Sequence, residues 1–159
     1  MCDQKNEKGP IILRHVGPGD SKDLFHWRNN PDVRKNFFNS EPLAWDEHEK
    51  WFHTQLKDPK TVAYMAYKKE NKIGTIRFED HGSSIKVSVM VNPAWIGKGF
   101  GTDLIERGVA LYRSEKKNMK PIVAEIKIEN KASVKAFQKA GFKESFVTYV
   151  FDKNITDTE

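Results

Sequence analysis

Residues 89–102 read VMVNPAWIGKGFGT, and this order of residue types decides the fold class. Alternating valines end a strand, a proline and a tryptophan follow, and glycines at 97, 99 and 101 precede an amphipathic run. Glycine allows backbone conformations barred to other residues, and the first N–H groups of a helix have no partner within it. A strand, a glycine loop and a helix start in this order predict a cradle for phosphate, with Lys98 beside it.

Two other phosphate-binding patterns do not fit this stretch. A Walker loop ends in Gly-Lys-Ser/Thr, whereas Lys98 is followed by Gly99. The dinucleotide fingerprint needs a third glycine at a different position from Gly101, and an acidic residue about 20 positions on. Taken alone, the glycines also fit a tight strand–helix connection that binds nothing.

The flanking sequence predicts a mixed α/β domain. Apolar residues at 85, 87, 89 and 91 alternate with polar or smaller ones, the pattern of a strand with one buried face. Similar patterns predict strands at 11–16, 62–68, 72–78, 122–128 and 146–151, and helices near 21–27, 45–57, 102–117 and 133–140. This order predicts antiparallel strands in the first half of the chain and a β-α-β unit in the second.

Length and composition predict one globular domain at 11–152, with flexible tails at 1–10 and 153–159. Cys2 is the single cysteine, and no apolar run approaches the roughly 20 residues of a membrane span, so we expect a cytoplasmic protein without membrane contact. The net charge of +5 is spread without a basic block, which argues against a nucleic-acid partner. No metal site is expected, and a homodimer is left open.

A second motif makes the interpretation specific. Residues 130–142 read NKASVKAFQKAGF, and together with Val-x-Val-x-Pro and the glycine loop they resemble the acetyl-CoA motifs of the GNAT superfamily. The resemblance implies an N-acetyltransferase in which strand backbone groups bind the pantetheine and the glycine loop binds the pyrophosphate. The residues it assigns to acetyl-CoA are Val89, Met90, Val91, Gly97, Lys98, Gly99, Phe100, Gly101, Thr102, Asn130, Ser133 and Phe137.

Two positions depart from the family pattern. Ile96 stands where members usually carry arginine or glutamine, so Lys98 or the backbone has to hold the phosphate there. Phe137 stands where many members have a tyrosine that is proposed to reprotonate the CoA thiolate. Phenylalanine has no proton to give, so another group, or water, supplies it, or no acid acts.

Acetyl transfer needs a neutral amine, and therefore a base. Glu125 lies on the predicted strand at 122–128, five residues before Asn130, and ribosomal-protein acetyltransferases carry a glutamate at the matching place. We expect Glu125 to be the base, with Glu79 in reserve; the alternative for Glu125 is a solvated residue paired with a lysine. The resemblance also implies that backbone N–H groups around Val89 to Val91 stabilise the developing oxyanion.

The first half of the chain is expected to bind the acceptor amine. Its motifs resemble one branch, which contains acetyltransferases of nucleotide-linked 4-amino sugars, as in pseudaminic-acid synthesis, and relatives among ribosomal-protein acetyltransferases. The candidate acceptor residues are Trp27, Arg28, Asn29, Arg34, His48 and Trp51. Arginine can grip a diphosphate with two hydrogen bonds and tryptophan can stack on a base, although core packing and surface ion pairs also explain such residues.

The acceptor is therefore predicted to be a small-molecule amine on a nucleotide-activated sugar. The alternatives are a protein α-amine, a small amine such as an aminoglycoside-like compound, and a non-catalytic module that binds acyl-CoA.

Overall fold

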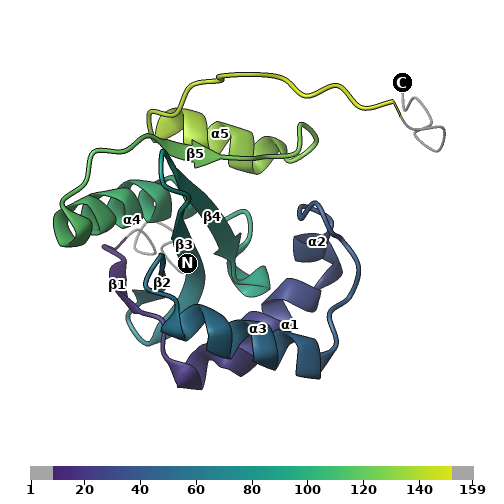
Figure 1. Ribbon diagram of the computed structural model, residues 1–159. Coiled ribbons are helices and arrows are strands. Elements are labelled where there is room, and N and C mark those ends of the chain that lie inside the picture. The colour runs from purple at the N-terminus through teal and green to yellow at the C-terminus, as the bar shows by residue number, and fades with distance from the viewer. Residues whose placement is uncertain (1–8, 152–159) are drawn as a thin grey trace, which may run out of the picture.

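The computed structural model describes residues 9–151, which form one mixed sheet with helices on both faces (Figure 1). Five strands lie in the order β1-β2-β3-β4-β5. They are β1 Ile12–His15, β2 Thr61–Lys68, β3 Asn71–Asp80, β4 Ile85–Val91 and β5 Ile122–Ala124. The first four pair antiparallel, and β5 joins β4 in parallel, so the predicted antiparallel half and β-α-β half are confirmed.

Residues 9–151 also form five α-helices. They are α1 Ser21–Asn29, α2 Pro31–Arg34, α3 Trp45–Lys57, α4 Gly101–Lys116 and α5 Lys131–Lys139. Of these, α1, α3 and α4 pack on the sheet. Short 3-10 turns, η2 Pro18–Asp20 and η3 Pro93–Trp95, lead into α1 and into the glycine loop. Helix α4 packs on one face of the sheet with α5 beside it, and α1 and α3 pack on the opposite face (Figure 1).

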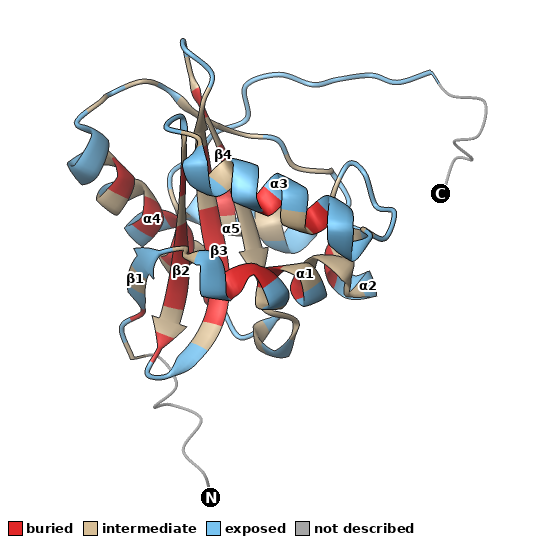
Figure 2. Ribbon diagram, turned by 60° about the horizontal axis from the view of Figure 1, so that its bottom comes forward, coloured by how far each residue is buried: buried red, intermediate tan, exposed pale blue. Residues whose placement is uncertain are grey.

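Strand alternation divides the buried side chains into two cores. Tyr64 and Ile76 face α4 and join the larger core, whereas Met65 packs with Leu24 of α1 and Phe52 of α3. Buried residues accordingly follow the strands and the sheet-facing sides of the helices (Figure 2). Helix α4 approaches the sheet closely at Gly108, where a Cβ would lie 2.7 Å from Cδ1 of Ile76.

Strands β4 and β5 part after only three paired residues. Their register runs from Ile85 opposite Ile122 to Val87 opposite Ala124 and then stops. The predicted strand at 122–128 is therefore much shorter than expected. From Ser88 to Val91, β4 keeps β3 as its only partner among the described residues, and a gap opens on its other side.

The strand predicted at 146–151 is wrong. Residues 143–151 form no regular structure, and this part of the chain passes over α5 and leaves the body of the domain (Figure 1). Its apolar side chains are exposed, Tyr149 to 92% and Phe151 to 95%. The composition suits a strand, but a strand needs a neighbour to pair with, and this segment has none within the described part of its own chain.

A buried carboxylate joins β1, the start of α1 and β3. Asp20 is 1% exposed, and its carboxylate accepts hydrogen bonds from Arg14 at 3.0 and 2.9 Å and from the N–H of Gly17 at 2.8 Å. Nζ of Lys72 lies 2.9 Å away. Burial alone would raise the pKa of Asp20, but the bonds from Arg14, Gly17 and Lys72 outweigh it and lower the pKa.

We expect Asp20→Asn to lower the free energy of unfolding by about 2–3 kcal/mol at neutral pH, because it removes a buried charge from partly exposed cations. Asp23→Asn is the matched control: Asp23 also pairs with Lys72, but its side chain is 46% exposed, so the loss should be about 0–1 kcal/mol. Urea denaturation of both variants checks this, and equal losses would contradict it.

The same contribution should depend on pH. Because the folded pKa of Asp20 is lowered, its stabilisation is complete above the unfolded pKa of about 3.9 and is lost as the pH falls through the folded value. The stability difference between the wild type and Asp20→Asn should therefore shrink in acid and stay constant near neutrality.

Candidate functional site

The glycine loop presents a row of free backbone donors. Gly97 and Gly99 have φ angles of +79° and +82°, and a Cβ at either position would meet no atom within 4 Å. Helix α4 begins at Gly101, has 16 residues and has no side-chain cap at its N-terminus. Within residues 9–151 no acceptor meets the N–H groups of Gly97, Gly99, Phe100, Gly101, Thr102 and Asp103. Free donors at the positive end of a helix suit an anion.

The edge of β4 adds donors beside this loop. The N–H of Ile85 points to the β5 side, since it donates to Pro121, and that of Asn92 points to β3, since it donates to Ile73. Hydrogen-bonding directions alternate along a strand, so Val89 and Val91 turn their N–H and C=O groups toward the β5 side. At these two residues β5 has already left. Met90 instead bonds toward β3 and turns its side chain to the opposite face from α4.

The remaining residues of the loop support its shape. Phe100 is buried and packs edge-on against Trp95, with 5.4 Å between ring centroids. Nζ of Lys98 lies over the Trp95 ring, 4.9 Å from its centroid, and Lys98 is otherwise exposed. Thr102 is half-buried in the first turn of α4.

The second motif lies next to the loop through α4 and α5. The side chain of Asn130 accepts the N–H of Ser133 at 3.3 Å and so caps α5. Phe137 is buried in the larger core, with its ring edge-on to Phe142. A Cβ on Gly101 would lie 3.3 Å from Cβ of Ala136, so the two helices touch at the glycine loop.

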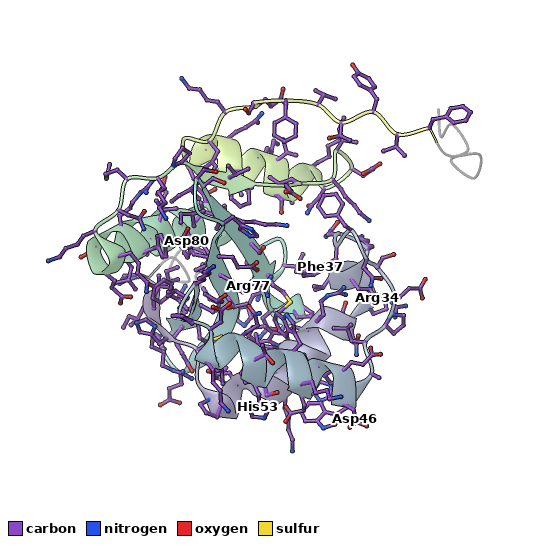
Figure 3. All side chains as sticks on the ribbon, in the orientation of Figure 1. Arg34, Phe37, Asp46, His53, Arg77 and Asp80 are labelled. Carbon is purple, nitrogen blue, oxygen red and sulfur yellow. The ribbon has the colours of Figure 1, made fainter. Side chains whose placement is uncertain are left out.

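A cavity of about 510 Å³ lies between the sheet and helices α1 and α3. It reaches Val89 and Met90 of β4, and therefore meets the gap where β5 has left. Its charged and histidine side chains are His15, Arg28, Glu47, His48 and Arg77, and Phe37 and Trp51 are among its aromatic residues. Figure 3 shows Arg77 over the sheet and Arg34 and Phe37 around α2.

Arg28 brings a poorly satisfied guanidinium to this cavity. Its Nη1 is buried without a hydrogen-bond partner, while Nη2 donates to the carbonyl of Asn39. The guanidinium carbon lies 4.0 Å from the centroid of the Phe37 ring. Burial, and after it the nearby charge of Arg34, lowers the pKa of Arg28, so the positive charge would gain from an anion.

Arg77 is a cavity residue that the sequence analysis did not select. It lies on β3, and its guanidinium carbon is 5.0 Å from the centroid of the Trp51 ring. Its Nε lies 2.8 Å from Oε1 of Glu79, an ion pair too bent for a hydrogen bond. Strand alternation in the sequence already placed Thr75, Arg77 and Glu79 on one face, and this was the signal that could have found it.

The predicted acceptor residues take different places. Trp51 and His48 line the cavity with Arg28, but Trp27 is buried in the smaller core and Arg34 lies outside the lining. The amide of Asn29 is used twice: it donates to the carbonyl of Leu43 at 2.9 Å and accepts its N–H at 2.8 Å. Asn29 therefore ties the segment after α2 to α1.

His48 is held as a neutral imidazole. Its Nε2 lies 2.9 Å from the carbonyl oxygen of Ser21, which can only accept, so Nε2 carries the proton. Burial lowers the pKa of His48 more than the Ser21 carbonyl and the charge of Glu49 raise it. The ring stacks on Phe52 at 5.8 Å between centroids and forms a fixed part of the cavity wall.

Both candidate bases lie outside the cavity lining, and Glu125 is the one at the start of the gap. Glu125 directly follows β5, is exposed, and lies 3.5 Å from Nζ of Lys86. Continuing the register of β4 and β5 would bring it opposite Ser88, the first residue of β4 that β5 does not pair with. Glu79 is engaged by Arg77 and lies 3.6 Å from Nε2 of His81.

Comparisons with known proteins identify the family. The family model described as Acetyltransferase (GNAT) domain matches residues 11–143. An uncharacterised protein of Methanocaldococcus jannaschii is 26% identical over 152 residues, which are 91% of this chain and 30% of that protein. The chain thus spans less than a third of this curated relative.

Solved structures share the fold. A spermidine N-acetyltransferase from Vibrio cholerae, in complex with CoA and spermine, matches with a TM-score of 0.77 and 23% identity, over 86% of this chain and 82% of that one. A domain from Methanocaldococcus jannaschii matches with a TM-score of 0.69 and 24% identity, over 85% of this chain and 89% of that one.

The chain therefore belongs to the GNAT acetyltransferase family, as the resemblance of its two motifs predicted. Between residues 9 and 151 no three His, Cys, Asp or Glu side chains gather as a metal site. No helix in that range is long and apolar enough to cross a membrane.

We expect Gly99→Val to raise the Kd for acetyl-CoA at least about tenfold, a loss of about 1.4 kcal/mol, because a side chain would cover the free donors of the loop. Gly82→Val is the matched control: Gly82 has a φ of +91° and equally open space in the β3–β4 turn. Both variants should lose similar stability, about 1–2 kcal/mol, but only the first should lose affinity in calorimetric titration.

Gly101→Val would be a poorer test, because the new side chain would press against Ala136 and disturb the contact between α4 and α5. Unchanged affinity in Gly99→Val would mean that the loop does not hold the pyrophosphate.

Proposed function

We propose that this protein transfers the acetyl group of acetyl-CoA to the amine of a nucleotide-activated amino sugar. The observation that carries the choice of acceptor is Arg28, a cavity arginine whose buried Nη1 has no hydrogen-bond partner among the described residues. Arg77 lines the same cavity as a second cation and is paired with Glu79. A buried N–H donor without an acceptor is costly, and a diphosphate would supply an acceptor.

The residues of the loop and of β4 fit acetyl-CoA. The free N–H groups of Gly97 and of residues 99–103 would hold the pyrophosphate, with the side chain of Lys98 at the edge of the site. The backbone of Val89 and Val91 would bind the pantetheine arm in the gap that β5 leaves. Bound there, acetyl-CoA supplies an activated acetyl group, and a free N–H of β4 can donate to its carbonyl oxygen as negative charge develops.

The charges of the cavity argue against a polyamine acceptor. The Vibrio cholerae enzyme of similar fold acts on spermidine, and its structure holds spermine. In this chain the charged side chains that line the cavity are Arg28, Arg77 and the single carboxylate Glu47, apart from the histidines. A polycation would meet two arginines of its own sign, whereas an acceptor that carries phosphates would be attracted.

Trp51 and Arg77 provide a surface for the nucleoside part. The guanidinium of Arg77 already lies over the indole of Trp51, which is 41% exposed at the cavity mouth. A flat cation on an aromatic ring is a platform on which a base or a sugar ring can stack. Trp27 was also predicted for this role, but it is buried in the smaller core, where it would support the cavity by packing rather than contact the nucleoside.

Glu125 is the proposed base. It lies at the end of β5 where the gap begins, and it is exposed. Within residues 9–151 its one ion pair is the 3.5 Å contact with Lys86, and from there it could take a proton from the amine, directly or through water. Phe137 is buried in the core and has no proton to donate, so the sulfur of the leaving CoA would be protonated by another group or by solvent.

Two experiments distinguish the proposed function from its alternatives. A protein α-amine or an aminoglycoside-like amine would need no diphosphate, and a non-catalytic module would bind acyl-CoA without turnover. Release of CoA in the presence of amines separates an enzyme from a binding module, and a panel of acceptors separates the enzymes.

We expect Glu125→Gln to lower kcat at neutral pH and to leave the Kd for acetyl-CoA nearly unchanged, because glutamine keeps the shape of glutamate but cannot accept a proton. The loss should shrink at high pH, where more of the amine is already neutral. Glu79→Gln is the comparison. If Glu125→Gln kept the wild-type rate and pH profile while Glu79→Gln lost them, the base would be Glu79.

We expect Arg28→Ala and Arg77→Ala to raise the KM for a nucleotide-linked amino sugar by one to two orders of magnitude, about 1.5–3 kcal/mol for a charge-assisted contact. Arg34→Ala should raise the same KM by a smaller factor, since Arg34 lies outside the cavity lining. Arg107→Ala is the control, an exposed arginine of α4 paired with Asp103 at 2.8 Å, and it should change nothing.

Steady-state kinetics with UDP-, CMP- and dTDP-linked amino sugars would measure these values. Efficient acetylation of polyamines, peptides or aminoglycosides, with every nucleotide sugar ignored, would overturn the acceptor that we propose.

A further inference from the structure

Glu125, the proposed base, lies outside the lining of the cavity that would hold the acceptor amine. A general base has to reach the proton that it removes within hydrogen-bond distance, directly or through one water. A side-chain hydroxyl can take the place of that water, because it accepts one hydrogen bond while it donates another. The hydroxyl groups of the cavity lining are therefore candidates for a link between the amine and Glu125.

The residues of the lining that carry a hydroxyl group are Thr61, Thr75 and Ser88. Thr75 donates to the carbonyl of Tyr64 at 2.9 Å, and Thr61 donates to two side chains at 3.2 and 3.3 Å. Oγ of Ser88 has no hydrogen-bond partner within residues 9–151, and Ser88 is half-buried. Among the described residues of the lining, Ser88 is thus the one whose hydroxyl is available to a bound amine.

Ser88 also lies at the start of the gap. It is the first residue of β4 that β5 does not pair with, and its partner on β3 is Arg77. Side chains alternate along a strand, so Ser88 projects to the same face of the sheet as Lys86. Nζ of Lys86 lies 3.5 Å from Oε2 of Glu125, so the carboxylate of Glu125 reaches over this face of β4. Ser88 is therefore the lining residue that lies nearest to Glu125 in register.

We propose that Ser88 is a catalytic residue that relays a proton from the acceptor amine to Glu125. The ammonium group of the acceptor gives one proton to Oγ of Ser88, while the hydroxyl proton of Ser88 passes to the carboxylate of Glu125. The relay rests on the proposed function, since it needs Glu125 as the base.

The neutral amine then attacks the carbonyl carbon of acetyl-CoA, so that a C–N bond forms, the C–S bond breaks and the CoA thiolate leaves. The nitrogen loses a second proton in this step, and the thiolate takes up one proton through solvent. Glu125 returns its own proton to solvent, which restores the carboxylate.

The charges around Ser88 favour this transfer. The charged and titratable side chains are Arg77 and Glu79 of β3, Lys86 of β4 and Glu125 on this face of the sheet, and Arg28 of α1 with Glu47 and His48 of α3 across the cavity. Arg77 is the cation directly opposite Ser88. A cation beside an ammonium group favours the loss of its proton, so an amine bound at Ser88 is deprotonated more readily there.

Steady-state release of CoA from acetyl-CoA, with a UDP-linked 4-amino sugar as acceptor, tests the relay. We expect Ser88→Ala to lower kcat at neutral pH at least about tenfold, and the loss to shrink at high pH, where more of the amine is already neutral. Ser88→Thr keeps the hydroxyl and should restore most of the rate. Both variants should keep the wild-type Kd for acetyl-CoA. Ser84→Ala is the matched control, because Ser84 precedes β4 and lies outside the cavity lining.

The double variant Ser88→Ala/Glu125→Gln separates a relay from two independent contributions. Groups on one proton path give non-additive losses, so the double variant should be no slower than Glu125→Gln alone. Losses that multiply would overturn the relay, and so would a Ser88→Ala enzyme with the wild-type kcat and pH profile. A loss in Ser88→Ala without one in Glu125→Gln would equally contradict it.

The same assay distinguishes failure of the relay from failure of the proposed acceptor. If the wild type acetylates another amine of the panel and ignores the nucleotide sugars, the acceptor is wrong, and the same variants are compared with that amine. A wild type that releases no CoA with any amine would refute both the relay and the proposed function.

Discussion

The early parting of β4 and β5 is the constraint on which the site depends. Asn92 holds the end of β4 on β3, since its N–H donates to Ile73 at 2.9 Å and its side-chain amide to Lys72 at 2.7 Å. Strand β5 ends at Ala124, and residues 125–130 connect it to α5. Two backbone units of β4, at Val89 and Val91, are thereby left free between the glycine loop and the cavity, where a thioester and an amine could meet.

Charge is divided between the two halves of the site. The proposed pyrophosphate site consists of backbone N–H groups at the start of α4, while the cavity proposed for the acceptor is lined by Arg28 and Arg77. Other cations are occupied in the structure itself, because Arg14 and Lys72 both contact buried Asp20. The net charge of +5 therefore does not identify a ligand by itself, and the buried Nη1 of Arg28 without a hydrogen-bond partner is the more informative observation.

Sequence patterns predicted correctly those elements whose structure depends on neighbouring residues. The alternation that ends at Val91 and the glycines after it define a strand, a turn and a helix start, and all three were predicted from sequence and found. The strand predicted at 146–151 was wrong, because a strand forms only where it can pair with the edge of another strand, and composition does not show whether such an edge is in reach. Trp27 and Trp51 are both helical tryptophans, and only the packing of α1 and α3 on the sheet shows which one enters the core and which one the cavity. Arg77 was missed for the same reason, since alternation gives its face but not the cavity on that face.

Amide hydrogen exchange along β4 tests the central claim most directly. Without ligand, the N–H groups of Val89 and Val91 should exchange fast and that of Met90 slowly, because the first two face the gap and the third faces β3. Saturating acetyl-CoA should slow Val89 and Val91 and leave Met90 unchanged. Slow exchange at Val89 and Val91 before any ligand is added, or no change when acetyl-CoA saturates the protein, would contradict the account.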